Sequence, residues 1–120
     1  MAKPGKTGLE RVKDAARYSY QGLRAEWQFE AAFRQEVVLF AIAVPLALLL
    51  GDNGLECALM IFSVGLVLIV ETINSSIEAV VDRISDEHHE LSGRAKDLGS
   101  AAVMLTLCLA GLVWLLIIFG

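Results

Sequence analysis

An uncharged apolar stretch runs from Leu98 to Phe119 near the end of the chain. As a helix it is long enough to cross the hydrocarbon core of a bilayer, which takes roughly 20 residues. Two further stretches qualify: one over 55–81, and one over 31–50 if its first charged side chains reach the interface. With 56% hydrophobic residues, the chain is too apolar for a typical small soluble domain. The sequence predicts a single membrane-embedded domain over 1–120, an all-α membrane protein with three transmembrane helices.

The basic residues predict how the chain is oriented in the membrane. Every Lys and Arg precedes Leu98, and none lies in the short Gly51–Gly54 turn. Because basic loops stay on the cytoplasmic side, we expect the N-terminus and the 83–97 loop in the cytoplasm and the C-terminus outside. The predicted location is the cell inner membrane, crossed several times.

The N-terminal part is polar and amphipathic. Residues 1–8, with Pro4, Gly5 and Gly8, predict a flexible tail. From Leu9 onward apolar residues recur every three or four positions, which predicts a helix over 9–28. Its opposite face is rich in charge, so we expect a surface helix on the cytoplasmic leaflet; the alternative is a helix packed on its own domain. The apolar face comprises Leu9, Val12, Ala16, Tyr20, Leu23 and Trp27.

The second predicted span ends in a stripe of polar side chains. With about 100° of turn per residue, five of them fall on one face of the helix. Carboxylates at the end of a membrane span are functional candidates by default, although pairing with neighbouring helices is the structural alternative. The upper carboxylate could meet a lipid group and the lower one a cation such as Mg²⁺. The five are Glu71, Asn74, Ser75, Glu78 and Asp82.

Two further clusters flank the spans. Before the first span, Glu30 is spaced i,i+4 from both Glu26 and Arg34. An exposed Glu30–Arg34 pair would contribute only about 0.3–0.5 kcal/mol. If this helix packs on the second span, Glu30 lies level with Glu78 and completes a two-carboxylate metal site.

The polar loop over 84–97 is the second cluster. Ser92-Gly93 within it predicts a break in the chain. It ends in Gly93-Arg94-Ala95-Lys96-Asp97, whose cations could neutralise a triphosphate; ordinary anchoring by basic residues is the alternative.

These motifs occur together, in this order, in one family. The chain resembles the small integral-membrane prokaryotic diacylglycerol kinases over nearly its whole length. The resemblance implies a homotrimer of three-span subunits, each with an N-terminal surface helix, and composite active sites at subunit contacts. The segments that carry it are Tyr18–Arg24, Glu30–Glu36, Glu71–Asp82 and His89–Asp97.

The resemblance also implies residue roles. Glu71 is expected to be the general base, and Glu30 and Glu78 to bind the metal. Nucleotide contacts are expected from Arg11, Tyr18, Glu30, Glu78, Glu87, Glu90, Lys96 and Asp97. Lipid-substrate contacts are expected from Ala15, Ala16, Arg17, Ser19, Tyr20, Arg24, Ala32, Phe33, Arg34, Gln35, Glu36, Glu71, Asn74, Ser100 and Trp114.

The implied activity is ATP-dependent phosphorylation of diacylglycerol to phosphatidate, with Mg²⁺ as cofactor. The expected partners are ATP, diacylglycerol, membrane lipid and further copies of the chain, and no nucleic acid. Two alternatives stay open: an undecaprenol kinase of the same family, and a small non-enzymatic membrane transporter.

Overall fold

The computed structural model describes residues 7–84 and 86–120. The described residues form four helices: α1 (Leu9–Phe29), α2 (Ala31–Leu50), α3 (Gly54–Ile84) and α4 (Glu90–Phe119). Of these, α2, α3 and α4 are long and apolar enough to cross a membrane, which confirms the prediction of three such helices. Most of the predicted flexible tail, residues 1–6, lies outside the described residues.

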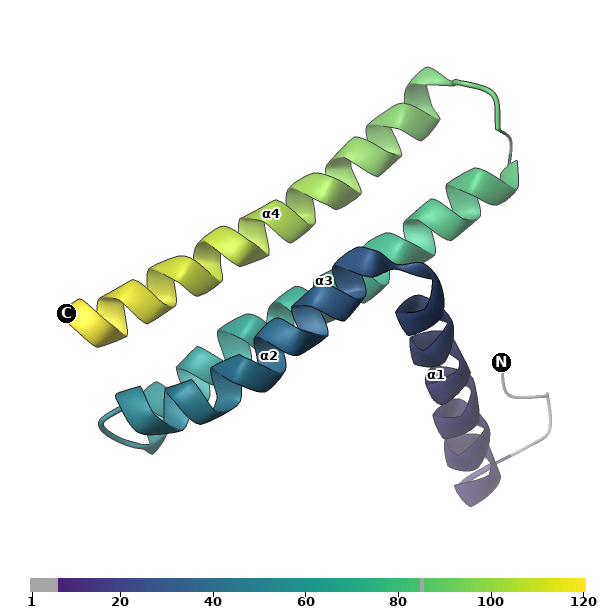
Figure 1. The fold of residues 1–120 in the computed structure, drawn as a ribbon. Helices are drawn as coiled ribbons and strands as arrows, with labels where there is room; N and C mark the ends of the chain where they lie inside the picture. The colour runs from purple at the N-terminus through teal and green to yellow at the C-terminus, as the bar shows by residue number, and fades with distance from the viewer. Residues whose placement is uncertain (1–6, 85) are drawn as a thin grey trace.

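Helix α3 is the centre of the arrangement. It packs against α2 on one side and α4 on the other, and α1 makes smaller contacts with α2 and α3 (Figure 1). At Glu30 the chain changes direction, so that α1 leaves the other three helices at a steep angle. The N-terminal end of α1 therefore lies far from the connection between α3 and α4 (Figure 1).

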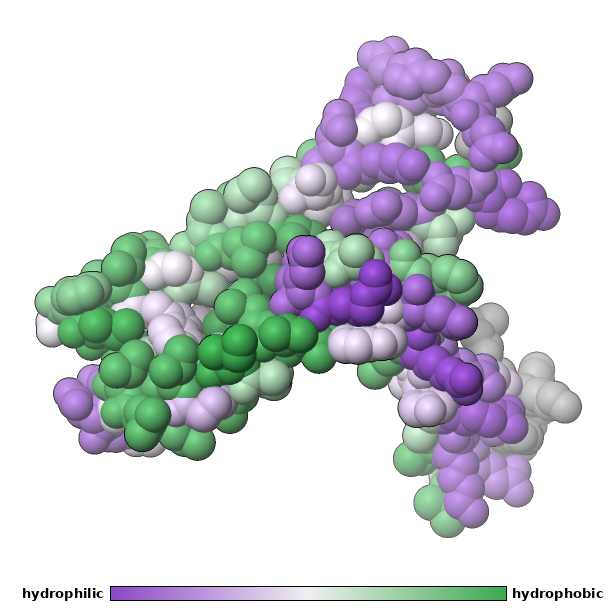
Figure 2. Space-filling view, viewed as in Figure 1, coloured by the Kyte–Doolittle hydropathy of each residue, from purple (hydrophilic) through white to green (hydrophobic). Residues whose placement is uncertain are grey.

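The contacts between α2, α3 and α4 bury mostly small or medium side chains. Ala43 and Ala47 of α2, Val64 and Val67 of α3, and Ala110 of α4 are all buried. Small residues at such contacts let helix backbones approach closely. Most large apolar side chains point outward, and Figure 2 shows them covering the visible shaft of the bundle. Exposing this apolar surface to water would be unfavourable, so in a bilayer it would face lipid tails or further protein.

The α2–α3 connection is a tight turn closed by its own side chains. Asn53 Oδ1 accepts a hydrogen bond from the Glu56 backbone N–H at 3.0 Å. Glu56 Oε1 in return accepts from the Asp52 backbone N–H at 3.0 Å. This reciprocal capping satisfies N–H groups that the first turn of α3 would otherwise leave open.

The predicted break at Ser92-Gly93 is wrong. Both residues lie inside α4, which begins at Glu90. His89 Nδ1 accepts from the Leu91 N–H at 3.0 Å, so the helix is capped before the glycine is reached. A cap contributes about 1 kcal/mol, which offsets the similar cost of glycine in a helix. Helix α3 also continues to Ile84, so both helices carry polar side chains beyond their apolar stretches.

Candidate active site

A group of carboxylates lies where the α1–α2 junction meets α3. Glu26, Glu30, Glu78 and Asp82 line a cleft of about 470 Å³ between these elements. Glu71 is buried on α3 beside them, with only 5% of its surface exposed. The structure thus brings together the three acids proposed for catalysis and metal binding, which come from two separate parts of the sequence.

Asn74 connects the polar stripe on α3. Its side chain is buried, and Nδ2 donates a hydrogen bond to Glu78 Oε1 at 2.9 Å. The same side chain also lies close enough to Glu71 to interact with its carboxylate. Its Oδ1 faces Gly99 of α4, where an added Cβ would overlap it. Asn74 therefore orients the Glu78 carboxylate beside Glu71, in a place available only because residue 99 has no side chain.

Glu30 lies at the break between α1 and α2. Its backbone is extended, and its N–H still donates to the Glu26 carbonyl at 2.8 Å, which closes the last turn of α1. Burial, followed by the negative charges of Glu78, Glu26 and Asp82, raises the pKa of Glu30 above its ordinary value. A cation bound there would relieve this repulsion.

Arg34 does not pair with Glu30. Its Nη1 donates instead to the backbone carbonyls of Trp27 at 2.8 Å and Gln28 at 3.4 Å. These carbonyls lie in the last turn of α1, where helix carbonyls lack partners. Arg34 thus caps α1 from α2, and the ion-pair interpretation of the i,i+4 spacing is not supported.

The position of Glu26 in this site was not predicted from the sequence. It is only 6% exposed and accepts hydrogen bonds from the hydroxyls of Thr72 and Ser75, each at 2.8 Å. Its position within the helix carried a signal, because Gly22 and Ala25 beside it are small and line the same cleft. Small residues on a helix face favour close approach of another helix.

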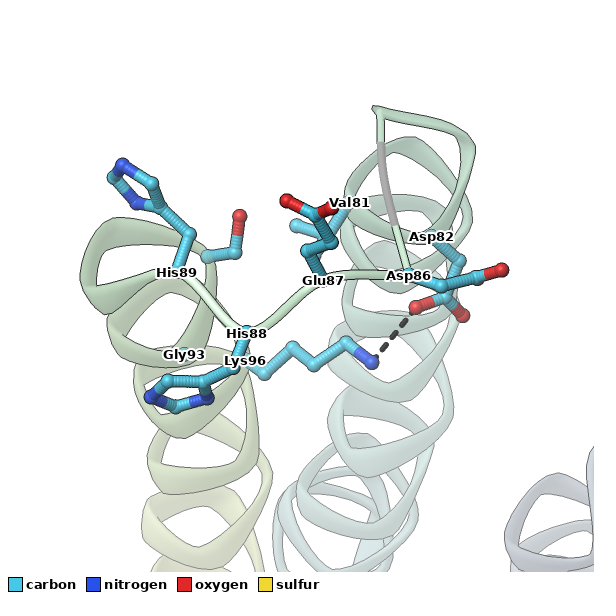
Figure 3. Close-up of a pocket in the computed structure, with 9 residues that line it drawn as sticks. Val81, Asp82, Asp86, Glu87, His88, His89, Gly93 and Lys96 are labelled. Atoms are coloured by element: carbon cyan, nitrogen blue, oxygen red, sulfur yellow. Dashed lines mark ion pairs between the residues drawn. The ribbon is translucent and has the colours of Figure 1, made fainter.

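A second polar cleft lies at the far end of α3 and α4. Lys96 reaches from α4 to Asp82 of α3, with Nζ and Oδ1 2.7 Å apart (Figure 3). This cleft of about 370 Å³ is also lined by Glu87, His88 and His89. Glu90 pairs with Arg94 at 3.4 Å, and Asp97 is exposed nearby on α4. Of the residues proposed for nucleotide binding, Glu87 and Lys96 therefore line one cleft, and Glu90 and Asp97 lie on the first turns of α4 beside it.

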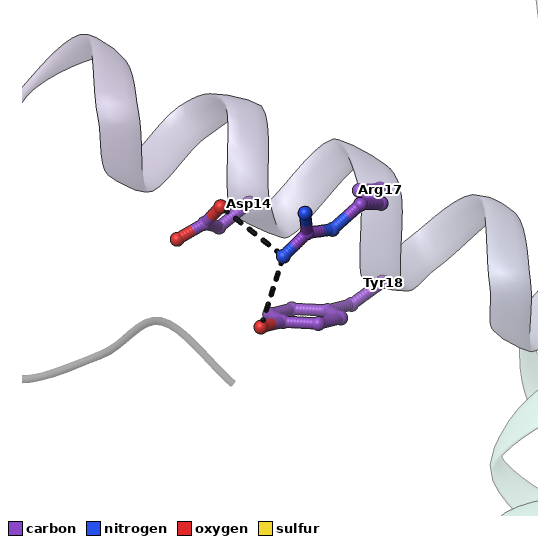
Figure 4. A network of polar contacts seen from close by, with 3 residues as sticks. All are labelled: Asp14, Arg17 and Tyr18. Atoms are coloured by element: carbon purple, nitrogen blue, oxygen red, sulfur yellow. Dashed lines mark hydrogen bonds and ion pairs between the residues drawn. The ribbon is translucent and has the colours of Figure 1, made fainter.

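Arg11 and Tyr18 are not part of this cleft. Both lie on α1, which points away from the α3–α4 connection. Tyr18 accepts a hydrogen bond from Arg17 at 3.3 Å, and Arg17 also pairs with Asp14 at 3.5 Å (Figure 4). The other α1 residues proposed for lipid contact are exposed: Ala15, Ala16, Ser19, Tyr20 and Arg24.

The remaining proposed lipid contacts fall into two groups. At the start of α2, Ala32 and Gln35 are exposed, Phe33 is buried, and Glu36 lies close enough to Glu71 for their charges to interact.

On α4, Ser100 is exposed next to Gly99, whereas Trp114 lies about 21 Å farther along the helix. Trp114 donates its indole N–H to the Met60 carbonyl at 3.1 Å and lines an apolar groove of about 240 Å³. The structure does not bring it to the acidic cluster.

Comparison with known proteins gives the same answer as the motifs. Residues 17–118 match the family described as "Prokaryotic diacylglycerol kinase". The chain belongs to this family. It is 53% identical to the diacylglycerol kinase of Escherichia coli (strain K12) over 114 residues, covering 95% of this chain and 93% of that protein. It is 51% identical to the Haemophilus influenzae diacylglycerol kinase over 108 residues, covering 90% and 92%. The Pseudomonas aeruginosa diacylglycerol kinase is 48% identical over 116 residues, covering 97% and 94%.

In this member of the diacylglycerol kinase family, the acidic cluster suits a hard cation only in part. Among the described residues, no three His, Cys, Asp or Glu side chains lie close enough to hold a metal by themselves. Glu30 and Glu78 supply two carboxylates. Mg²⁺ characteristically takes one or two protein carboxylates and completes its shell with water and substrate phosphates. The two residues therefore fit a metal that arrives with a nucleotide.

Proposed function

We propose that this protein transfers the γ-phosphoryl group of ATP to the primary hydroxyl of diacylglycerol, giving phosphatidate and ADP. Membership of a family whose relatives are named diacylglycerol kinase supports the substrate. The observation that carries the proposal is the position of Glu71: a buried carboxylate where α3 passes from apolar to polar residues, with Glu78 and Glu30 beside it. If the apolar part of α3 spans the bilayer, Glu71 would lie near the interface, which the hydroxyl of a lipid can reach.

Glu71 is the proposed general base. As the lipid hydroxyl oxygen attacks the γ-phosphorus, its proton passes to the Glu71 carboxylate, and the bond to the ADP oxygen breaks. Such a base contributes typically about 10²–10⁴ in rate. Asn74 lies beside the Glu71 carboxylate and interacts with it. Phosphoryl transfer otherwise depends on positioning and charge stabilisation.

Glu30 and Glu78 are the proposed metal ligands. When bound, Mg²⁺ would neutralise charge on the phosphate oxygens. Asn74 leaves one oxygen of Glu78 open, because its Nδ2 contacts only Oε1. Among the described side chains none donates to the Glu30 carboxylate, which leaves that group available as well. Both carboxylates therefore have oxygens that no described side chain occupies.

The nucleotide contacts are proposed to come from two subunits of a homotrimer. Lys96, Glu87, Glu90 and Asp97 lie at the α3–α4 end, whereas Arg11 and Tyr18 lie on α1. One chain does not bring these groups together. A neighbouring copy could supply the missing set and would also cover part of the exposed apolar surface.

The proposed setting is the cytoplasmic face of the cell inner membrane. The N-terminus and the α3–α4 connection would be cytoplasmic, where ATP is available, and the C-terminus outside. Helix α1 would lie on the leaflet, since its large apolar side chains are exposed and could enter the interface.

The test is phosphate transfer by the purified protein in mixed micelles with radiolabelled ATP and Mg²⁺. Diacylglycerol and undecaprenol are offered separately and together. We expect labelled phosphatidate from wild type and from Glu10→Gln, a variant of an exposed glutamate outside the cluster. Preferential labelling of undecaprenol would show that undecaprenol, and not diacylglycerol, is the lipid substrate. No labelling of either lipid would reject kinase activity.

A further inference from the structure

The Glu26 carboxylate bridges one helical turn of α3. Its Oε1 accepts from Thr72 Oγ1 and its Oε2 from Ser75 Oγ, both at 2.8 Å. Thr72 and Ser75 are three residues apart and so present their hydroxyls on the same helix face. The Thr72 hydroxyl also has the Leu68 carbonyl within 2.9 Å, so its single proton is divided. The Ser75 hydroxyl, by contrast, donates its proton to Glu26 Oε2.

Apolar burial does not hold α1 on α3. The large apolar side chains nearest to Glu26 stay exposed: 48% of the surface of Leu23, 46% of Trp27 and 77% of Phe29. Asp14 and Glu26 are the buried residues of α1, and Glu26 hydrogen-bonds two hydroxyls of α3. The attachment of this helix to α3 therefore depends on a polar contact.

The contact lies one helical turn before Glu30. The Glu30 N–H donates to the Glu26 carbonyl at 2.8 Å, so the two residues share the last turn of α1. Arg34 caps the same turn from α2. Fixing Glu26 on α3 consequently fixes the distance between Glu30 and Glu78, which come from different helices.

We propose that Glu26 is a positioning residue: bound by Thr72 and Ser75, it locks the end of α1 onto α3 and holds Glu30 opposite Glu78. We assign it this role and not that of a metal ligand, because both of its oxygens are turned toward hydroxyls of α3. The consequence for metal binding rests on the function proposed above, whereas the lock itself does not.

The lock also adds negative charge to the site. Glu26 interacts electrostatically with Glu30 and with Glu71. Glu26→Gln separates the two contributions, since an amide of the same shape can accept from one hydroxyl and donate to the other while carrying no charge. Glu26→Ala removes both contributions.

The first experiment is hydrogen exchange of the full chain in micelles, without Mg²⁺ or substrate, read at residues 20–30. We expect wild type, Glu26→Gln and the control Glu10→Ala to share the same protection. Glu26→Ala and the double variant Thr72→Val/Ser75→Ala each lose two hydrogen bonds to a charged group and should exchange at least about tenfold faster there, the effect of one such bond. Unchanged protection of α4 would show that each variant is folded. Equal protection in Glu26→Ala would overturn the lock.

The second experiment is a Mg²⁺ titration of lipid kinase activity in the same variants. We expect Glu26→Ala to raise the half-saturating Mg²⁺ concentration by about tenfold, with turnover at saturation changed much less. Glu26→Gln should raise it less than Glu26→Ala does. If Glu26→Gln keeps the hydrogen-exchange protection of wild type but loses turnover at saturating Mg²⁺, the positioning role is overturned. Inactive wild type would reject the proposed function, while hydrogen exchange would still decide the lock.

Discussion

The side-chain oxygen of Asn74 lies against the backbone of Gly99. The buried amide of α3 therefore meets α4 at a residue that has no side chain. The same Asn74 hydrogen-bonds Glu78 and lies beside Glu71. The packing of two helices and the orientation of the Glu78 carboxylate therefore depend on one position.

Gly99→Ala should reduce activity strongly and stability moderately. The new Cβ would overlap Asn74 Oδ1 and force that side chain away from Glu71 and Glu78. Alanine is better than glycine in a helix by about 1 kcal/mol, which should offset only part of the lost hydrogen bond to the Glu78 carboxylate, worth about 1.5–3 kcal/mol. The measurements are turnover and the free energy of unfolding in micelles. Gly111→Ala is the control on the same helix, because nothing lies within 4 Å of its added Cβ. Equal activity of the two variants would contradict this prediction.

Glu71→Gln and Glu78→Gln should fail in different ways. Without a general base, Glu71→Gln should lose about 10²–10⁴ in turnover and still bind Mg-ATP. Glu78→Gln should instead weaken Mg-ATP binding, since a neutral amide is a poor ligand for Mg²⁺. Single-turnover kinetics and nucleotide titration separate the two effects. Full activity of Glu71→Gln would discard the base assignment, and unchanged Mg-ATP affinity of Glu78→Gln would remove it from the metal site.

Asp82 and Lys96 should matter for binding more than for folding. Their side chains are 62% and 44% exposed, and exposed ion pairs contribute at most about 1 kcal/mol. Asp82→Asn should therefore leave the free energy of unfolding nearly unchanged. Lys96→Met should raise the KM for ATP, because it removes a cation from the polar cleft at the α3–α4 end. An ATP KM that does not respond to Lys96→Met would exclude this lysine from nucleotide binding.

Trp114→Phe distinguishes a structural from a substrate role for this indole. The variant keeps an aromatic ring but loses the hydrogen bond to the Met60 carbonyl, and we expect a loss of stability of about 1 kcal/mol. Thermal or denaturant unfolding in micelles measures this loss. If Trp114 also contacts the lipid substrate, the KM for diacylglycerol should rise in parallel. A stable variant with an unchanged lipid KM would argue against both roles.

The local parts of this protein could be predicted from the sequence alone. The three long apolar helices follow from the length of the apolar stretches, because a bilayer requires a minimum helix length. The stripe of Glu71, Asn74 and Glu78 follows from helical periodicity within one uninterrupted helix. The family could likewise be recognised from contiguous motifs, and the comparisons confirm it.

Contacts between distant segments were decided only by the tertiary structure. Glu26 meets Thr72 and Ser75 across sequence separations of 46 and 49 residues, and no local pattern specifies such pairs. Asn74 finds space only because α4 brings Gly99 against it. The break expected at Ser92-Gly93 is absent because a cap at His89 offsets the helix penalty of one glycine. Periodicity and apolar length act within a helix, whereas the choice of polar partners depends on how helices pack against one another.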